Sequence, residues 1–123
     1  MDYFQLGAGA LAYLGDAVLE ALIREALILK GYEKSAHLNR EALKYVTAVN
    51  QCKAFANISE HLTEEEAAIF KRGKNCSHLN IPKSASAVEY KTATGFEAIF
   101  GLLHLKKDAS RIKELFTLAY PEL

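Results

Sequence analysis

Apolar residues recur at helical spacing in one segment after another, and proline, which interrupts helices, occurs only at Pro82 and Pro121. No long stretch alternates apolar and polar residues as a half-buried strand does. Gly31 and Gly73 are natural helix ends, and Thr63 followed by three glutamates is a typical helix start. Ser35 and Asp108 are candidate caps of the second and the last helix. The β-branched residues at 46, 47 and 49 leave open whether a second and a third helix are continuous. The sequence predicts an all-α fold of about six helices, at residues 10–30, 35–45, 47–60, 64–73, 87–105 and 109–120.

Length and composition fit one domain. Of the 123 residues, 50% are hydrophobic and 24% are charged, which is an ordinary balance for a globular protein with a real core. The sequence contains no internal repeat, low-complexity tract or interdomain linker, so we expect a single domain over residues 1–123. The formal net charge is zero. No global field therefore attracts nucleic acid or a membrane, and any polyanionic partner must meet a local patch.

The cysteines and the N-terminal residues indicate in which cellular compartment the protein is expected. Cys52 and Cys76 form no CxxC motif, and the N-terminus lacks the basic region of a secretory leader. Reduced thiols and a cytoplasmic location are expected. The apolar stretch 3–19 contains Asp16, which is costly in lipid, so it predicts a buried helix and no membrane span.

Two carboxylates stand alone in the two most apolar predicted helices. Asp16 is the only charged residue between Tyr3 and Leu19, and Glu97 is the only Asp, Glu, Lys or Arg between Thr92 and Leu105. An unpaired buried carboxylate costs several kcal/mol, so such acids need a cation, a hydrogen-bond network or a catalytic task. We therefore expect the two helices to converge on a shared hard cation such as Mg²⁺, which accepts one or two carboxylates and keeps several waters.

A structural role for each acid remains an alternative. Asp16 could cap a helix break at Gly15, and Glu97 could pair with Lys91 or Lys106. Glu20 lies one turn beyond Asp16 and could join the metal site, although a salt bridge to Arg24 four residues later explains it equally well.

A basic segment precedes the second acid. Residues 67–88 contain no Asp or Glu, in a chain that is otherwise neutral. Lysine, arginine and small polar side chains position a nucleic-acid backbone without reading its bases. A solvated polar loop is the plainer explanation. The candidate nucleic-acid-binding residues are Lys71, Arg72, Lys74, Asn75, Lys83 and Lys91.

The segments around the two acids resemble the ribonuclease III family. Residues 11–20, LAYLGDAVLE, resemble the signature helix of its catalytic domain, and residues 93–101, ATGFEAIFG, resemble its second acidic helix. Segments 71–75, 81–83 and 90–97 are also similar, in the same order and spacing. The match covers essentially the whole chain and leaves no room for the double-stranded-RNA-binding domain that usually follows. This pattern is similar to the short bacterial Mini-ribonuclease III family.

The resemblance implies an all-helical endonuclease domain that works as a homodimer, with two active sites facing one RNA duplex. It implies Mg²⁺-dependent hydrolysis, with Mn²⁺ able to substitute, that leaves 5′-phosphate and 3′-hydroxyl ends. The implied substrate is the precursor of 23S ribosomal RNA, whose ends would be matured in ribosome biogenesis. By the same resemblance Asp16 matches the catalytic and metal-binding Asp, and Glu97 matches the catalytic and metal-binding Glu.

Two departures from the longer relatives leave alternatives open. Those relatives carry acids where this chain has Ala12 and Thr94, so the carboxylates per protomer fall from four to two. One Mg²⁺ completed by water and phosphate oxygens is then easier to support than two metal ions. The other interpretations are a catalytically weak or inactive dimeric module that binds structured RNA, and a helical interaction protein whose acids are satisfied internally.

Overall fold

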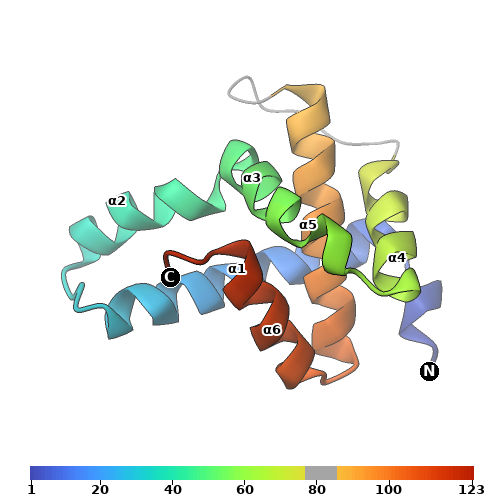
Figure 1. Cartoon of the computed structure of the whole chain (residues 1–123), viewed down its shortest axis with the longest axis horizontal. Coiled ribbons are helices and arrows are strands. Elements are labelled where there is room, and N and C mark those ends of the chain that lie inside the picture. The colour runs from blue at the N-terminus through green and yellow to red at the C-terminus, as the bar shows by residue number, and fades with distance from the viewer. Residues whose placement is uncertain (77–85) are drawn as a thin grey trace.

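The computed structural model describes residues 1–76 and 86–123, and these residues form an all-helical domain (Figure 1). Within these ranges no residue belongs to a strand. The predicted all-α fold with six helices is confirmed. The helices are α1 (Ala8–Leu29), α2 (Ser35–Val46), α3 (Ala48–Ile58), α4 (Glu64–Lys74), α5 (Ala87–Leu105) and α6 (Ala109–Ala119), with short 3₁₀ turns η1 (Tyr3–Gln5) and η2 (Ser59–His61).

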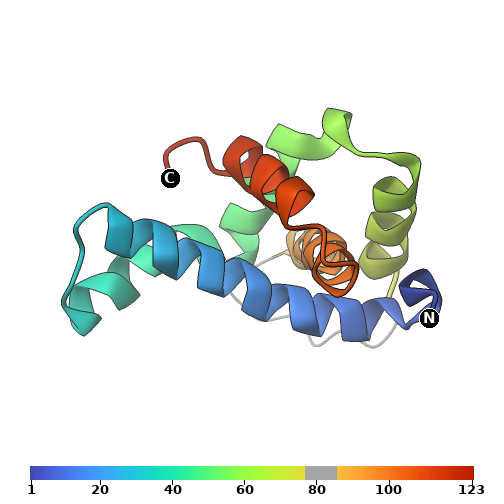
Figure 2. The ribbon, with the colours of Figure 1, turned by 90° about the horizontal axis from the view of Figure 1, so that it is seen from below.

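Helix α5 is the centre of the fold. Figure 2 shows it nearly end-on, with α1, α4 and α6 around it. Phe96, Ile99 and Phe100 are fully buried, as is Leu102 one turn further on. A helix that is apolar on every side is buried on every side. Glu97, the acid in this apolar stretch, therefore lies among buried neighbours.

Glycines allow α1 and α5 to cross with their backbones in contact. A Cβ atom built on Gly101 would lie 1.9 Å from the carbonyl oxygen of Leu11, and Gly15 is equally crowded by α5. Helix α4 approaches α5 in the same way, since a Cβ on Gly73 would lie 2.9 Å from the Cα of Gly95. Small residues at a crossing let helix axes approach more closely than larger side chains permit. The crossing of α1 and α5 is what places the two acids side by side.

Most predicted helix ends are confirmed by their caps. Thr63 and Glu66 form a reciprocal capping box, and the Asp108 side chain accepts a hydrogen bond from the Arg111 backbone. Thr47 caps α3, so α2 and α3 are separate helices. Gly31 follows α1 with a φ of +106°, a conformation that favours glycine.

Several predicted boundaries differ from the structure by one or two residues, among them the start of α1 at Ala8. Lys34, without a side-chain hydrogen bond, occupies the cap of α2, and Ser35 is its first residue. The third helix ends at Ile58 and continues as η2, whose tighter turn replaces the expected last turn. Helix α4 runs one residue past Gly73, because that glycine serves the contact with α5 and does not end the helix.

The C-terminal half of α1 and the whole of α2 extend away from the remaining helices (Figure 1). No residue of α2 is buried. Among the described helices, none is both long and apolar enough to cross a membrane.

Candidate active site

One pocket contains both isolated acids. Its walls come from three elements: the N-terminal half of α1, the junction of α2 and α3, and the first turns of α5. Asp16 and Glu97, 81 positions apart in the chain, both line it. The predicted convergence of the two acids is confirmed. The remaining lining residues are Gly7, Gly9, Ala10, Ala12, Tyr13, Val46, Thr47, Ala48, Gln51, Tyr90, Ala93 and Thr94.

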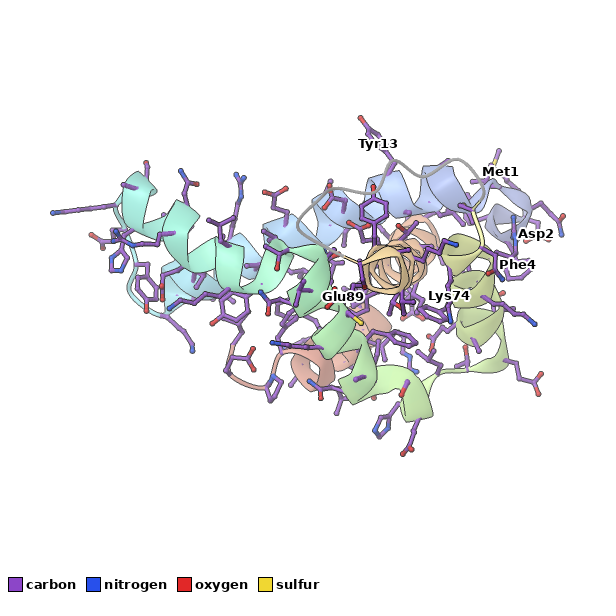
Figure 3. All side chains as sticks on the ribbon, turned by 90° about the horizontal axis from the view of Figure 1, so that it is seen from above. Met1, Asp2, Phe4, Tyr13, Lys74 and Glu89 are labelled. Carbon is purple, nitrogen blue, oxygen red and sulfur yellow. The ribbon has the colours of Figure 1, made fainter. Side chains whose placement is uncertain are left out.

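The two acids differ in burial, which corrects the expectation that both are buried. Glu97 is half-buried among fully buried neighbours on α5, whereas Asp16 is exposed. Asp16 lies on a side of α1 that the other described helices leave exposed. Tyr13, one turn earlier, is 86% exposed there and points away from the helices in Figure 3. The energetic cost of an unpaired acid therefore falls on Glu97.

The pKa of Glu97 is raised to about 9. Burial is the largest cause, followed by a hydrogen bond with Asp16 and the negative charge of Asp16. A hydrogen bond from the Gln51 side chain acts in the opposite direction and lowers the pKa. In the absence of a cation, Glu97 thus keeps its proton at neutral pH. A cation bound between Asp16 and Glu97 would neutralise the negative charge of the carboxylates in place of that proton.

The structural alternatives for the acids do not fit the geometry. Helix α1 continues without a break through Gly15, so Asp16 caps nothing. Lys106 pairs with Glu65, and no ion pair within the described residues joins Glu97 to Lys91. Glu20 was predicted either to join the metal site or to pair with Arg24. In the structure it forms a salt bridge of 2.9 Å with Arg24.

Ala12 and Thr94, at which the resemblance implies acids in the longer relatives, also line the pocket. Both are buried, and the Thr94 hydroxyl donates to the Tyr90 carbonyl oxygen at 3.0 Å. Residues 1–76 and 86–123 contain no group of three or more His, Cys, Asp or Glu side chains arranged to bind a metal. The site therefore offers two carboxylates, with Thr94 turned to its own helix.

Gln51 is the site residue that sequence reasoning missed. It lies on α3, is 3% exposed, and is one of the few buried polar residues of the domain. Its signal in the sequence was weak but present. Gln51, Ala54 and Ile58 share the buried face of α3, so a polar residue occupies an otherwise apolar stripe.

The predicted RNA-binding residues separate into different environments. Lys71, Lys74 and Asn75 are exposed at the end of α4, and Lys91 is exposed on α5. Lys74 is visible there in Figure 3. Lys83 lies outside the described residues.

Arg72 is occupied by the N-terminal segment. Its guanidinium donates to the backbone oxygens of Phe4 and Leu6, the latter at 2.8 Å, and lies 5.2 Å from the centre of the Phe4 ring. These contacts use the donors that an RNA phosphate would need, so Arg72 has a structural task as well as its charge.

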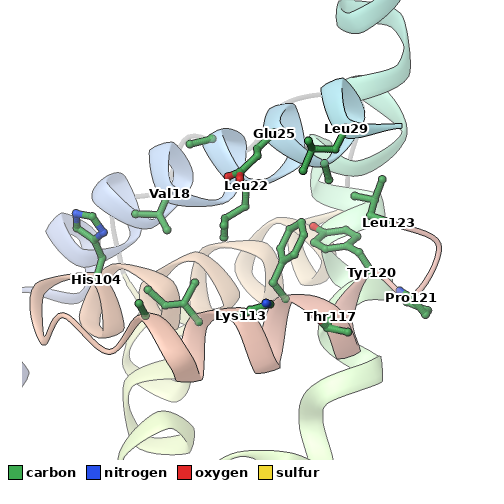
Figure 4. A pocket seen from close by; sticks show the side chains of 15 residues that line it. Val18, Leu22, Glu25, Leu29, His104, Lys113, Thr117, Tyr120, Pro121 and Leu123 are labelled. Atoms are coloured by element: carbon green, nitrogen blue, oxygen red, sulfur yellow. The ribbon is translucent and has the colours of Figure 1, made fainter. Parts of the chain in front are cut away.

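A second hollow lies between α1 and α6 (Figure 4), and Asp16 is not part of its lining. Its walls are mostly apolar, including Val18, Leu22 and Leu29. Glu25 and Lys113 are charged residues on these walls, and no pair of acids converges there. The acid pocket is therefore the better candidate for phosphodiester chemistry.

The chain has relatives among known proteins. The family model described as the ribonuclease III domain matches residues 9–108. A protein of Symbiobacterium thermophilum named Mini-ribonuclease 3 is 43% identical over 109 residues, covering 89% of this chain and 84% of that protein. A Mini-ribonuclease 3 of Enterococcus faecalis is 42% identical over 116 residues, and the match covers 93% of this chain and 88% of that protein.

The fold also has a counterpart among solved structures. The crystal structure of a Fusobacterium nucleatum protein matches with a TM-score of 0.86 and 35% identity, over 97% of this chain and 96% of that one. Sequence and structure therefore agree over nearly the whole length.

Proposed function

This chain belongs to the ribonuclease III family as an endoribonuclease of double-stranded RNA, and we propose that it matures the 23S ribosomal RNA precursor with Asp16 and Glu97 as catalytic carboxylates. The observation that carries the site assignment is the convergence of these two acids in one pocket, with the pKa of Glu97 raised to about 9. Strongly perturbed acids in a cleft are typical of catalytic sites.

The donor set of the pocket fits Mg²⁺, with Mn²⁺ as a substitute. Asp16 and Glu97 offer hard oxygen atoms, and no cysteine or histidine of residues 1–76 and 86–123 lines the pocket. Asp16 is exposed, so water and a phosphate oxygen can reach the same point. When bound, Mg²⁺ supplies a water of lowered pKa and stabilises negative charge on the leaving oxygen. To hold the cation, Glu97 would release its proton to solvent, and Asp16 would be the second carboxylate that holds the cation.

The basic residues would hold the RNA backbone. Lys71, Lys74 and Asn75 are exposed together at the end of α4, and Lys91 is exposed on the helix that carries Glu97. Contacts of this kind read the shape and phosphates of an A-form duplex, not its sequence. Lys83 is proposed to contact the RNA backbone as well, because it is a lysine of the same basic segment.

The proposed assembly is a homodimer. Tyr13 is 86% exposed beside Asp16, and the neighbouring small residues Ala10 and Ala17 are also uncovered. A large aromatic side chain in this position favours a protein partner. A second copy on this face would put two acid pockets near one duplex, so that each pocket could cut one strand. The proposed setting is the cytoplasm, where precursor ribosomal RNA would be met.

The test is cleavage of a precursor 23S stem by the purified chain with Mg²⁺, followed by mapping of the RNA ends. Wild-type protein is expected to leave 5′-phosphate and 3′-hydroxyl ends. Asp16→Asn and Glu97→Gln are expected to abolish cleavage while circular dichroism and light scattering report an unchanged fold and dimer. Full activity in either variant would falsify the site assignment.

The same experiment tests the runner-up function, a dimeric module that binds structured RNA without cutting it. The two-carboxylate site is the observation that favours it, since the longer relatives use four. Binding of the duplex without cleavage, across titrations of both Mg²⁺ and Mn²⁺, would support the module and overturn the nuclease assignment.

A further inference from the structure

The hollow between α1 and α6 is an open trough with two helical walls (Figure 4). Its volume is about 690 Å³, and its lining runs from Val18 to Leu29 on α1 and from Ala109 to Tyr120, the residue that caps α6. In Figure 4 the two walls run side by side in the same direction. At 1.5 Å per residue each wall is roughly 16 Å long, which is about three turns of a helix.

The rest of the domain leaves the apolar side chains of these walls partly uncovered. Leu29 is 79% exposed, and Val18, Leu22 and Phe116 are half-buried. Contiguous exposed apolar surface of this kind marks an interaction site, whereas single exposed apolar residues do not. On α1 the residues 18, 22 and 29 follow one side of the helix, as residues do that pack against another helix.

One acid and one base flank this apolar lining from opposite walls. Glu25 belongs to α1 and Lys113 to α6 (Figure 4). Both are exposed, and neither takes part in an ion pair among the described residues. A nucleic acid, with charge of one sign, would be attracted by Lys113 and repelled by Glu25. An occupant with a base on one flank and an acid on the other complements both walls.

We propose that this hollow binds an amphipathic helix of a partner protein, about three turns long, with a basic flank toward Glu25 and an acidic flank toward Lys113. A helix bound in a groove is recognised by apolar anchors one turn apart, and these would lie between the two walls. The apolar contacts supply affinity, and the two charges set the direction of the helix and the choice of partner. A small apolar ligand needs a site that encloses most of its surface, but Leu29 is open to solvent.

The test selects helices from a phage-displayed peptide library against the full chain. Each peptide carries a fixed leucine stripe, and its flank positions vary among Lys, Glu and Gln. Selected peptides are expected to carry lysine on one flank and glutamate on the other. In fluorescence-anisotropy titrations, Glu25→Lys should weaken their binding by about three- to tenfold. Glu33→Lys, which makes the same change of charge at an exposed acid outside the hollow, should not.

Leu29→Gln and Ile28→Gln form a second matched pair. Both residues are exposed apolar side chains at the end of α1, but only Leu29 lines the hollow. Leu29→Gln should weaken peptide binding by about fivefold, because the leucine loses its apolar contact with the bound helix. Ile28→Gln should leave peptide binding unchanged. Cleavage of duplex RNA should be the same in Leu29→Gln and Glu25→Lys as in wild type, since this inference goes beyond the proposed function and does not depend on it.

Four outcomes would overturn the inference. The library could yield no enriched peptides, or enriched peptides without opposite charges on the two flanks. The hollow variants and their controls could lose binding equally. A changed oligomeric state of Leu29→Gln in light scattering would assign the hollow to a second copy of this chain. Failure of the proposed function is seen separately, as wild-type protein that does not cut duplex RNA, whatever the peptides do.

Discussion

A Cβ atom built on Gly15 would lie 1.7 Å from the carbonyl oxygen of Glu97. The residue before one acid is thus in backbone contact with the other acid. No side chain fits between them, and the side chains of Asp16 and Glu97 are forced into the same pocket. The geometry of the site is therefore a property of the helix crossing, not of a flexible loop.

Gly15→Ala is expected to destabilise the protein strongly, because the methyl group meets backbone atoms that cannot rotate away. Overpacking a core costs about 1–3 kcal/mol, and a clash with backbone lies at or above the upper end. Urea denaturation gives the free energy of unfolding. Gly7→Ala is the control, since nothing lies within 4 Å of a Cβ there, and its loss should stay within about 1 kcal/mol. Equal stability of Gly15→Ala and wild type would contradict the crossing described above.

The raised pKa of Glu97 makes stability depend on pH. The folded value of about 9 lies above the ordinary value of 4.5, so the folded state binds the proton more tightly than the unfolded chain. Stability is therefore unaffected below about pH 4.5 and falls as pH rises toward 9, by several kcal/mol in total. Glu97→Gln should remove this fall and be more stable than wild type at pH 8. Unfolding free energies of both proteins at several pH values provide the test, and parallel curves would contradict the assigned shift.

Local signals in the sequence were sufficient for the fold. The caps at Thr63 and Asp108 and the left-handed Gly31 act within a few residues, so they could be read without knowing the tertiary structure. The pairing of Asp16 with Glu97 was also predictable, because an acid alone in an apolar helix has few ways to be satisfied.

The parts that were missed depend on which helix covers which face. Asp16 was expected to be buried, but its side of α1 is left open by the other helices. Arg72 was predicted to bind RNA, yet its guanidinium donates hydrogen bonds to the backbone oxygens of Phe4 and Leu6. Gln51 became a site residue only through the packing of α3 beside α5. None of these placements is set by residues nearby in the sequence.

Thr94→Asp is expected to strengthen metal binding. Thr94 is buried in the same pocket as Glu97, so a carboxylate there adds an anionic ligand, and Mn²⁺ affinity should rise by about 10-fold or more. The metal-free variant should be less stable than wild type, because it gains an unpaired buried acid, and Mg²⁺ should restore that stability. Thermal unfolding with and without Mg²⁺ measures both effects.

The control for Thr94→Asp is Thr92→Asp, on the same helix and buried but outside the pocket. It should lose stability without recovering it in Mg²⁺. If both variants respond alike to Mg²⁺, position 94 does not face the cation.

Arg72 and Lys74 are expected to respond differently to replacement by alanine, although they are neighbours on α4. Arg72→Ala removes two hydrogen bonds to backbone oxygens and the contact with Phe4. It should mainly lower the unfolding temperature, because charged hydrogen bonds contribute about 1.5–3 kcal/mol each. Lys74 is exposed and makes no ion pair among the residues described. Lys74→Ala should leave stability unchanged and weaken binding of duplex RNA.

The salt dependence of RNA binding separates the two effects. Each lost phosphate contact lowers the slope of log affinity against log salt by roughly 0.7–0.9. Lys74→Ala should show this change in a binding titration between about 50 and 200 mM salt, and Lys113→Ala, on α6 by the apolar hollow, should not. An unchanged slope in Lys74→Ala would remove the end of α4 from the RNA-binding surface, since an exposed lysine there has no other way to act on the duplex than through its charge.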